Sequence, residues 1–158
     1  MRGWCLLALK RSAEASKAFS TSIKLGGKQT RAAAYGKALS VLRMGLTNEA
    51  LDIANTHSLT ARQRKTINLE ILTQRARASF NNRDFAATLI ALDRRQRHQT
   101  ETRDLSLMRA WSRFHLGHAQ RANTLFAALD HQLSTRETRS GLRASQSAVH
   151  RQSPISSR

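Results

Sequence analysis

The apolar positions between residues 105 and 133 form two helical patterns separated by one glycine. Before Gly117 they recur every three residues, on one face of a helix, at Leu105, Met108, Trp111 and Phe114. After Gly117 a second helical pattern follows, at Ala119, Ala122, Leu125, Phe126, Leu129 and Leu133. Glycine adopts a positive φ at low steric cost, so the chain can reverse direction there. The stretch therefore predicts a hairpin of two amphipathic helices.

A similar arrangement recurs along the chain. Its first helix carries a small residue at Gly3, Ala38, Ala76 and Ala110, in steps of 35, 38 and 34 residues. A period near 34 with two helices per unit predicts a helical repeat array. We expect helix pairs over about residues 1–25, 30–58, 64–97 and 102–133, a capping helix over 134–147, and a disordered basic tail over 148–158.

The composition favours an all-α protein. The chain of 158 residues has one proline and seven glycines, which argues against a β sandwich with its frequent turns. A membrane-spanning helix needs about 20 consecutive apolar residues, and the sequence contains no such run. The single cysteine, Cys5, excludes an internal disulfide, and its place on an apolar helix face predicts a buried side chain.

The recurring small, turn and aromatic positions of the helix pairs resemble the tetratricopeptide repeat family. The matching residues are Gly3, Ala38 and Ala110 in the first helix, Gly45 and Gly117 at the turn, Ala15, Ala50 and Ala122 opening the second helix, and Phe19 and Phe126 within it. The chain departs from the family pattern at Arg83 in place of the turn glycine, at Thr88 in place of alanine, and in lacking the usual proline after the second helix. The resemblance implies a solenoid of antiparallel hairpins with three to four repeats, the first incomplete, as expected for part of a longer array or for a truncated reading frame. A generic helical bundle is the alternative.

In that family the first helix of each repeat lines a concave groove that holds an extended peptide or another helix. The resemblance therefore implies a groove formed by Tyr35, Leu39, Leu42 and Arg43, by Thr73, Arg77 and Asn81, and by Leu107, Trp111 and His115. Family members that bind acidic C-terminal tails carry asparagine where this chain has Leu39, Arg77 and Trp111, so we do not expect that ligand. The alternative for Leu107 and Trp111 is a place in the core.

A narrower resemblance points to the periplasmic repeat component of bacterial cellulose synthase and to related exopolysaccharide-export proteins. It depends on Arg2-Gly3-Trp4, Arg109-Ala110-Trp111, Gly117 and Gly141-Leu142. It implies a scaffold in an export assembly, in the periplasm if the chain is a fragment of such a protein. A complete chain would instead be expected in the cytoplasm.

The charge balance introduces a second functional class. The chain carries 27 basic and 10 acidic residues, a net charge of +17, and such a charge attracts nucleic acid and other polyanions. The most concentrated basic patch is Arg62, Arg64 and Lys65. Binders of single-stranded nucleic acid place aromatic side chains beside such basic residues, but Phe85, Trp111, Phe114 and Phe126 fall on predicted core stripes. Nucleic-acid binding would depend on charge alone, and an arginine-rich composition can also reflect the coding bias of a genome.

Catalytic motifs are not found. The sequence contains no phosphate-binding glycine loop, dinucleotide fingerprint, zinc-protease motif or nucleophile elbow. His115 and His118 are three residues apart, but the turn at Gly117 separates them and no cysteine or carboxylate lies near. We therefore expect a protein- or peptide-binding scaffold without enzymatic activity, cofactor or metal. A helical accessory domain of an enzyme is a further alternative.

Overall fold

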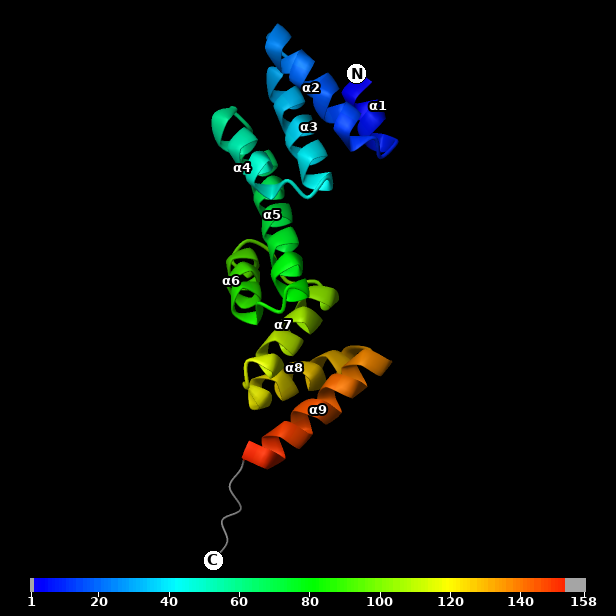
Figure 1. Cartoon of the computed structure of the whole chain (residues 1–158), viewed down its shortest axis with the longest axis vertical. Coiled ribbons are helices and arrows are strands. Elements are labelled where there is room, and N and C mark those ends of the chain that lie inside the picture. The colour runs from blue at the N-terminus through cyan, green and yellow to red at the C-terminus, as the bar shows by residue number, and fades with distance from the viewer. Residues whose placement is uncertain (1, 153–158) are drawn as a thin grey trace, which may run out of the picture. The chain divides into compact units, whose positions relative to one another are not determined.

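The protein is helical throughout the part that the structure describes. A computed structural model describes residues 2–152, and within them the chain forms helices and no strand. Figure 1 labels the helices as α1 (Arg2–Ala8), α2 (Ser12–Leu25), α3 (Thr30–Arg43), α4 (Thr47–Thr56), α5 (Ala61–Asn81), α6 (Phe85–Gln96), α7 (Arg103–His115), α8 (Ala119–Gln132) and α9 (Arg136–Gln152). The all-α class predicted from the sequence is confirmed.

The first compact unit extends to Arg75, and α1, α2, α3 and α4 pack there against one another in chain order. Its larger core joins α3 and α4 to the first turns of α5, and a smaller one surrounds Phe19 between α1, α2 and α3. Cys5 lies outside both cores with its side chain exposed. The prediction of a buried cysteine was wrong, because the seven-residue helix α1 buries only Gly3, Leu6 and Leu7.

The second unit begins at Ala76 and contains α6, α7, α8 and α9, each packed against the next along the chain. One cluster of buried side chains joins the end of α5 to α6 and α7, through Ala76, Leu92 and Leu105. A second cluster lies between α7 and α8, around Phe126. The polar face of each helix is left to solvent, as expected for amphipathic helices.

The same turn closes four helices in the described chain. In each, one residue has a positive φ, and its N–H and that of the next residue donate to carbonyls three and five positions back. This is the hydrogen-bond pattern of a Schellman motif. The positive-φ residues are Lys10, Gly45, Arg83 and Gly117, each seven positions after the small residue noted in the sequence. The next helix then begins two residues later in every case.

The positions that match between helix pairs are buried alike. The small residues Gly3, Ala38, Ala76 and Ala110 are all buried, and so are Ala15, Ala50, Thr88 and Ala122 in the second helices. Thr88 is accommodated where the other pairs have alanine because its hydroxyl donates to the carbonyl of Asp84 at 2.8 Å. A buried hydroxyl with a hydrogen-bond partner avoids most of the cost of desolvation.

Three helix starts within residues 2–152 have side-chain caps. The Asp84 carboxylate accepts from the backbone N–H of Ala87 at 3.0 Å, the bond expected of an aspartate at this position. Thr60 and Gln63 exchange side-chain and backbone hydrogen bonds before α5, which is a capping box. The box that precedes α9 is formed by Thr135 and Thr138. The spacing in the sequence predicts Ser134 with Glu137, one residue earlier.

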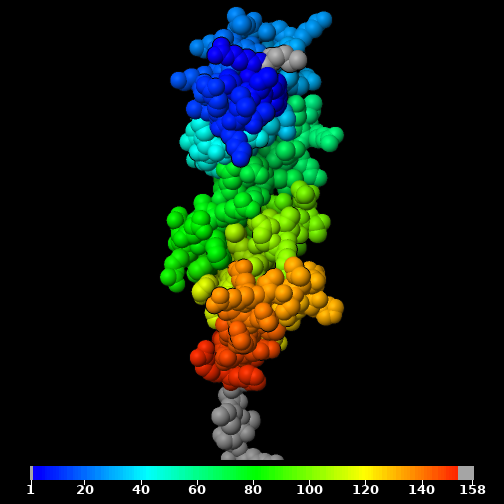
Figure 2. All heavy atoms as spheres, turned by 90° about the vertical axis from the view of Figure 1, so that its right-hand side faces the viewer, coloured from blue at the N-terminus to red at the C-terminus, as the bar shows by residue number. Residues whose placement is uncertain are grey.

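Helix α9 packs on α8 and α7 through a glycine (orange and red in Figures 1 and 2). A Cβ added at Gly141 would lie 2.3 Å from the Phe126 ring, so only glycine allows this approach. The helix continues to Gln152, five residues beyond the predicted end. Residues 148–152 are therefore helical and not part of a disordered tail, whereas residues 153–158 of that predicted tail lie outside the described chain.

Candidate interaction surfaces

The groove residues predicted in unit 1 do not all face solvent. Leu42 is only 2% exposed and belongs to the core that joins α3 to α4. Its assignment to a binding groove was wrong, because the start of α5 covers that face of α3 with Ile67 and Ile71. Tyr35 and Leu39 are half-buried, each packed beside a core cluster and still partly open.

Two other predicted groove residues of unit 1 make structural hydrogen bonds. The Arg43 guanidinium donates to the carbonyl of Leu7 near the end of α1. The Thr73 hydroxyl donates to the carbonyl of Leu69, one turn earlier in α5, at 2.8 Å. Arg43 therefore links α1 to α3 while remaining exposed. The Leu7 carbonyl also accepts from the backbone N–H of Lys10, so the guanidinium is the second donor to this oxygen.

In unit 2 the predicted groove residues of α5, Arg77 and Asn81, are exposed. Arg77 forms an ion pair with Asp104 of α7, with 2.9 Å between nitrogen and oxygen, and both side chains are largely exposed. The Thr102 hydroxyl is the main cause that lowers the pKa of Asp104; partial burial opposes the shift and Arg77 adds to it. Asn81, the last residue of α5, is also exposed.

The α7 face, which we define as Leu107, Trp111 and His115, combines buried and open aromatic surface. The half-buried Trp111 ring packs edge-on against Phe126, with 4.9 Å between ring centroids. The exposed imidazole of His115 stacks on Phe85 of α6 at 4.4 Å. Leu107 is half-buried beside the core around Phe126. Trp111 therefore belongs to the core with one edge and to the surface with the other.

Burial and the nearby Arg83 guanidinium lower the pKa of His115, with burial the larger cause. Both causes favour the neutral imidazole, because a cation loses hydration against the Phe85 ring and is repelled by a second cation. At neutral pH the α7 face therefore presents an uncharged aromatic and aliphatic surface in a strongly basic chain.

The predicted basic patch is exposed at the start of α5. Arg62, Arg64 and Lys65 all reach solvent in its first turns. No acidic residue lies in this turn, so the helix dipole adds its positive end to the three cations. No aromatic side chain lies among residues 61–79 of α5, so this part of the helix offers no ring of its own for stacking of bases.

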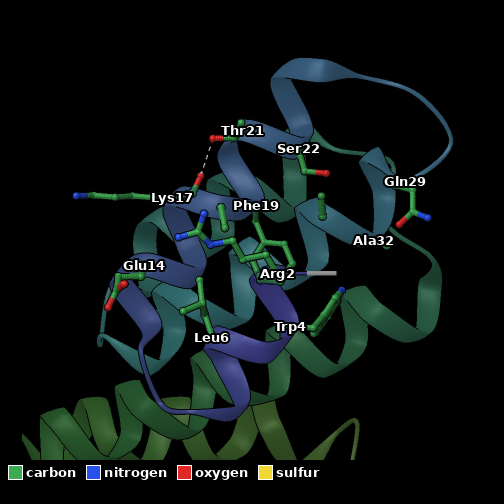
Figure 3. A pocket seen from close by; sticks show the side chains of 13 residues that line it. Arg2, Trp4, Leu6, Glu14, Lys17, Phe19, Thr21, Ser22, Gln29 and Ala32 are labelled. Carbon is green, nitrogen blue, oxygen red and sulfur yellow. Dashed lines mark hydrogen bonds between the residues drawn. The ribbon is translucent and has the colours of Figure 1, made fainter.

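Sequence reasoning missed a hollow in unit 1, the α1–α3 pocket, which has a volume of about 450 Å³. Figure 3 shows Trp4, Gln29 and Ala32 on one side, Glu14 and Lys17 on the other, and Arg2 and Phe19 between them. Trp4 is 38% exposed. One signal could have found it: Arg2-Gly3-Trp4 matches Arg109-Ala110-Trp111, and Trp111 is a predicted groove residue.

The described residues offer little for metal binding or membrane insertion. No group of three or more metal-ligating side chains gathers within residues 2–152. Within the same residues, every helix is too short or too polar to cross a bilayer. Comparisons with protein-family models, with curated proteins and with solved structures find no match for this chain.

Proposed function

We propose that the chain is a non-catalytic scaffold of tetratricopeptide-like helix pairs that binds a peptide or helix of another protein. The recurrence of one turn at Lys10, Gly45, Arg83 and Gly117 supports the repeat assignment. Each turn has the same spacing from buried small residues on both sides. Repeats of this kind leave one face of their first helices free for a ligand. A role in an exopolysaccharide-export assembly stays a prediction from the sequence.

The observation that carries the proposal is the partly open apolar surface of the α7 face. Leu107 and Trp111 leave apolar surface open beside the neutral imidazole of His115. Tryptophan supplies a large contact area with few rotatable bonds, and it is enriched among residues that dominate binding energy. A surface of this kind fits a peptide with an aliphatic or aromatic side chain that packs beside Trp111.

The test is a selection of peptides from a random library against the nuclease-treated chain at physiological salt. We expect binders whose affinity falls at least about tenfold in Trp111→Ala and several-fold in His115→Ala. Leu116→Ala is the matched control, because Leu116 is exposed at the end of α7 and outside the α7 face. Circular dichroism checks that each variant keeps its helices.

Two results would contradict the proposal. One is that no selected peptide depends on Trp111 or His115 for affinity. The other is that His115→Ala, which removes an exposed ring, leaves every binder unaffected while Trp111→Ala unfolds unit 2. That second pattern would assign Trp111 to the core alone.

A second candidate is nucleic-acid binding, favoured by the net charge of +17 and by the exposed patch of Arg62, Arg64 and Lys65. Such binding releases counterions, so its affinity falls steeply with salt. Peptide binding at an apolar face depends on salt only weakly. Alanine at all three positions separates the two functions, because it removes the patch and leaves the α7 face intact.

A further inference from the structure

The α1–α3 pocket combines apolar walls with basic groups that lack described partners. Trp4 packs edge-on against Phe19 at 5.0 Å and forms one apolar wall. Glu14 already pairs with Arg11 at 2.6 Å, so its charge is neutralised. Arg2 and Lys17 also line the pocket, and neither side chain makes an ion pair within residues 2–152. The pocket therefore has a net positive charge beside an aromatic surface.

The same arrangement exists in unit 2. Trp4 and Phe19 pack with an interplanar angle of 72°, and Trp111 and Phe126 pack at 69° with nearly the same centroid distance. In both cases a glycine of the following helix lies against the phenylalanine, Gly36 in α3 and Gly141 in α9. A serine four residues later donates to that glycine's carbonyl at 2.8 Å in both helices. The Trp–Phe–Gly–Ser arrangement thus recurs, and Arg2 has the sequence position of Arg109, two residues before the tryptophan.

Arg109 shows what such an arginine binds. Its guanidinium forms ion pairs with Asp93 in the last turn of α6 and with Glu101 in the segment before α7. Gln96, the last residue of α6, accepts a further hydrogen bond at 3.3 Å. The arginine is thus covered by the C-terminal end of α6, which supplies Asp93, and by the segment after it, which supplies Glu101. At Arg2 no described residue plays this part.

We propose that the α1–α3 pocket binds the C-terminal end of an acidic α-helix from a partner protein. Carboxylates at the end of that helix and in the segment after it pair with Arg2 and Lys17, as Asp93 and Glu101 pair with Arg109. An apolar side chain of the same helix packs on Trp4 and Phe19. The volume of about 450 Å³ is within the usual range for a binding pocket. This site lies in unit 1 and does not depend on the function proposed for the α7 face.

The probe is a labelled peptide derived from the segment that covers Arg109. It spans residues 85–102 with Arg94→Glu and Arg97→Glu, because both arginines are exposed and the changes make the peptide acidic. Fluorescence anisotropy with the full chain is expected to give a Kd of about 100 μM or tighter. A control peptide with Asp93→Asn and Glu101→Gln added should bind at least about tenfold more weakly.

Variants of the chain separate this site from general attraction by charge. Arg2→Glu with Lys17→Glu is expected to weaken binding at least about tenfold. Lys24→Glu with Lys28→Glu changes the net charge equally at exposed positions outside the pocket, and should stay within about twofold of the unmodified chain. Arg2→Gln alone serves as a milder variant if melting by circular dichroism shows that the double variant has unfolded.

The proposal is overturned if the labelled peptide does not bind, or if both charge-reversed chains lose affinity equally. Equal loss would mean that the overall field of the chain, and not the pocket, attracts the peptide. It is also overturned if Arg2→Gln leaves the affinity unchanged in a folded chain.

Discussion

In each helix pair of this chain, one residue between the two helices adopts a left-handed backbone. Two of them, Gly45 and Gly117, are glycines and reach this conformation at little cost. The other two, Lys10 and Arg83, have φ values of 60° and 61° and carry a Cβ. For a non-glycine residue that conformation costs about 1 kcal/mol. The turn is therefore kept by its flanking hydrogen bonds and packing, even where the local residue opposes it.

Exchange of glycine and non-glycine residues at these turns should change stability in opposite directions. Gly117→Ala is expected to lower the free energy of unfolding by about 1 kcal/mol. The cost comes from the backbone alone, since an added Cβ would meet nothing within 4 Å. Arg83→Gly should raise the free energy of unfolding by about 0.5–1 kcal/mol. Urea unfolding followed by circular dichroism measures both, and a shift of the same sign in both variants would contradict the turn geometry.

His115 should make the stability of unit 2 depend on pH. Its pKa is lower in the folded chain than in the unfolded chain, so the folded state binds fewer protons in that range. Stability is unaffected at alkaline pH and falls as the pH drops through the unfolded value of about 6.5 and then through the folded pKa. The effect is expected to be small because the imidazole is exposed. Urea midpoints at pH 8 and pH 5 measure it, and His115→Gln should remove this part of the difference.

At the scale of elements, the junction between α6 and α7 contains a buried ion pair between Arg109 and Glu101. The Arg109 side chain is 6% exposed and that of Glu101 is 7% exposed, whereas Asp93 remains largely in solvent. A buried pair of this kind is sensitive to the loss of one partner, because the remaining charge stays desolvated. The junction therefore fixes the angle at which α7 leaves α6, and with it the position of the α7 face.

Arg109→Met is expected to lower the free energy of unfolding by about 3–5 kcal/mol, since Glu101 would lose its partner. Adding Glu101→Leu should recover much of that loss, because the pair is then replaced by apolar groups. Arg77→Ala is the control: it removes an exposed ion pair and should cost less than about 1 kcal/mol. Chemical unfolding of the three variants gives the comparison, and an equal cost for Arg77→Ala would show that burial is not the deciding factor.

At the scale of the whole molecule, the chain has a net charge of +17, and the α7 face is a neutral surface within it. Charge of this size attracts any polyanion and raises association rates without choosing a sequence. Specific recognition has to come from places where shape and apolar contact add to charge. The α7 face and the α1–α3 pocket are two such places, one neutral and one basic.

The net charge predicts that the chain binds nucleic acid weakly and without sequence preference. We expect the affinity for duplex DNA to fall at least about tenfold between 50 mM and 200 mM salt, because each phosphate contact releases a counterion. Filter binding with two unrelated duplexes measures the effect. A tight complex that persists at 200 mM salt and prefers one duplex would contradict the prediction and favour nucleic-acid binding as the function.

The local features of the fold could be predicted from the sequence because they depend on neighbouring residues in the chain. Helical periodicity, the cap at Asp84 and the reversal at Gly117 all depend on side chains a few positions apart. The sequence showed that Arg83 stands where the repeat pattern expects the turn glycine. Only the structure showed that Arg83 adopts the same positive-φ backbone as those glycines.

Which side of each helix faces solvent was decided by tertiary packing. Leu42 lies on the helix face that the first turns of α5 cover, whereas Trp111 keeps one edge open although both residues are apolar. Burial depends on which neighbour covers a face, and periodicity along one helix does not contain that information. The pairing of Arg109 with Asp93 and Glu101, and the pocket beside Arg2, likewise exist only because separate segments of the folded chain meet.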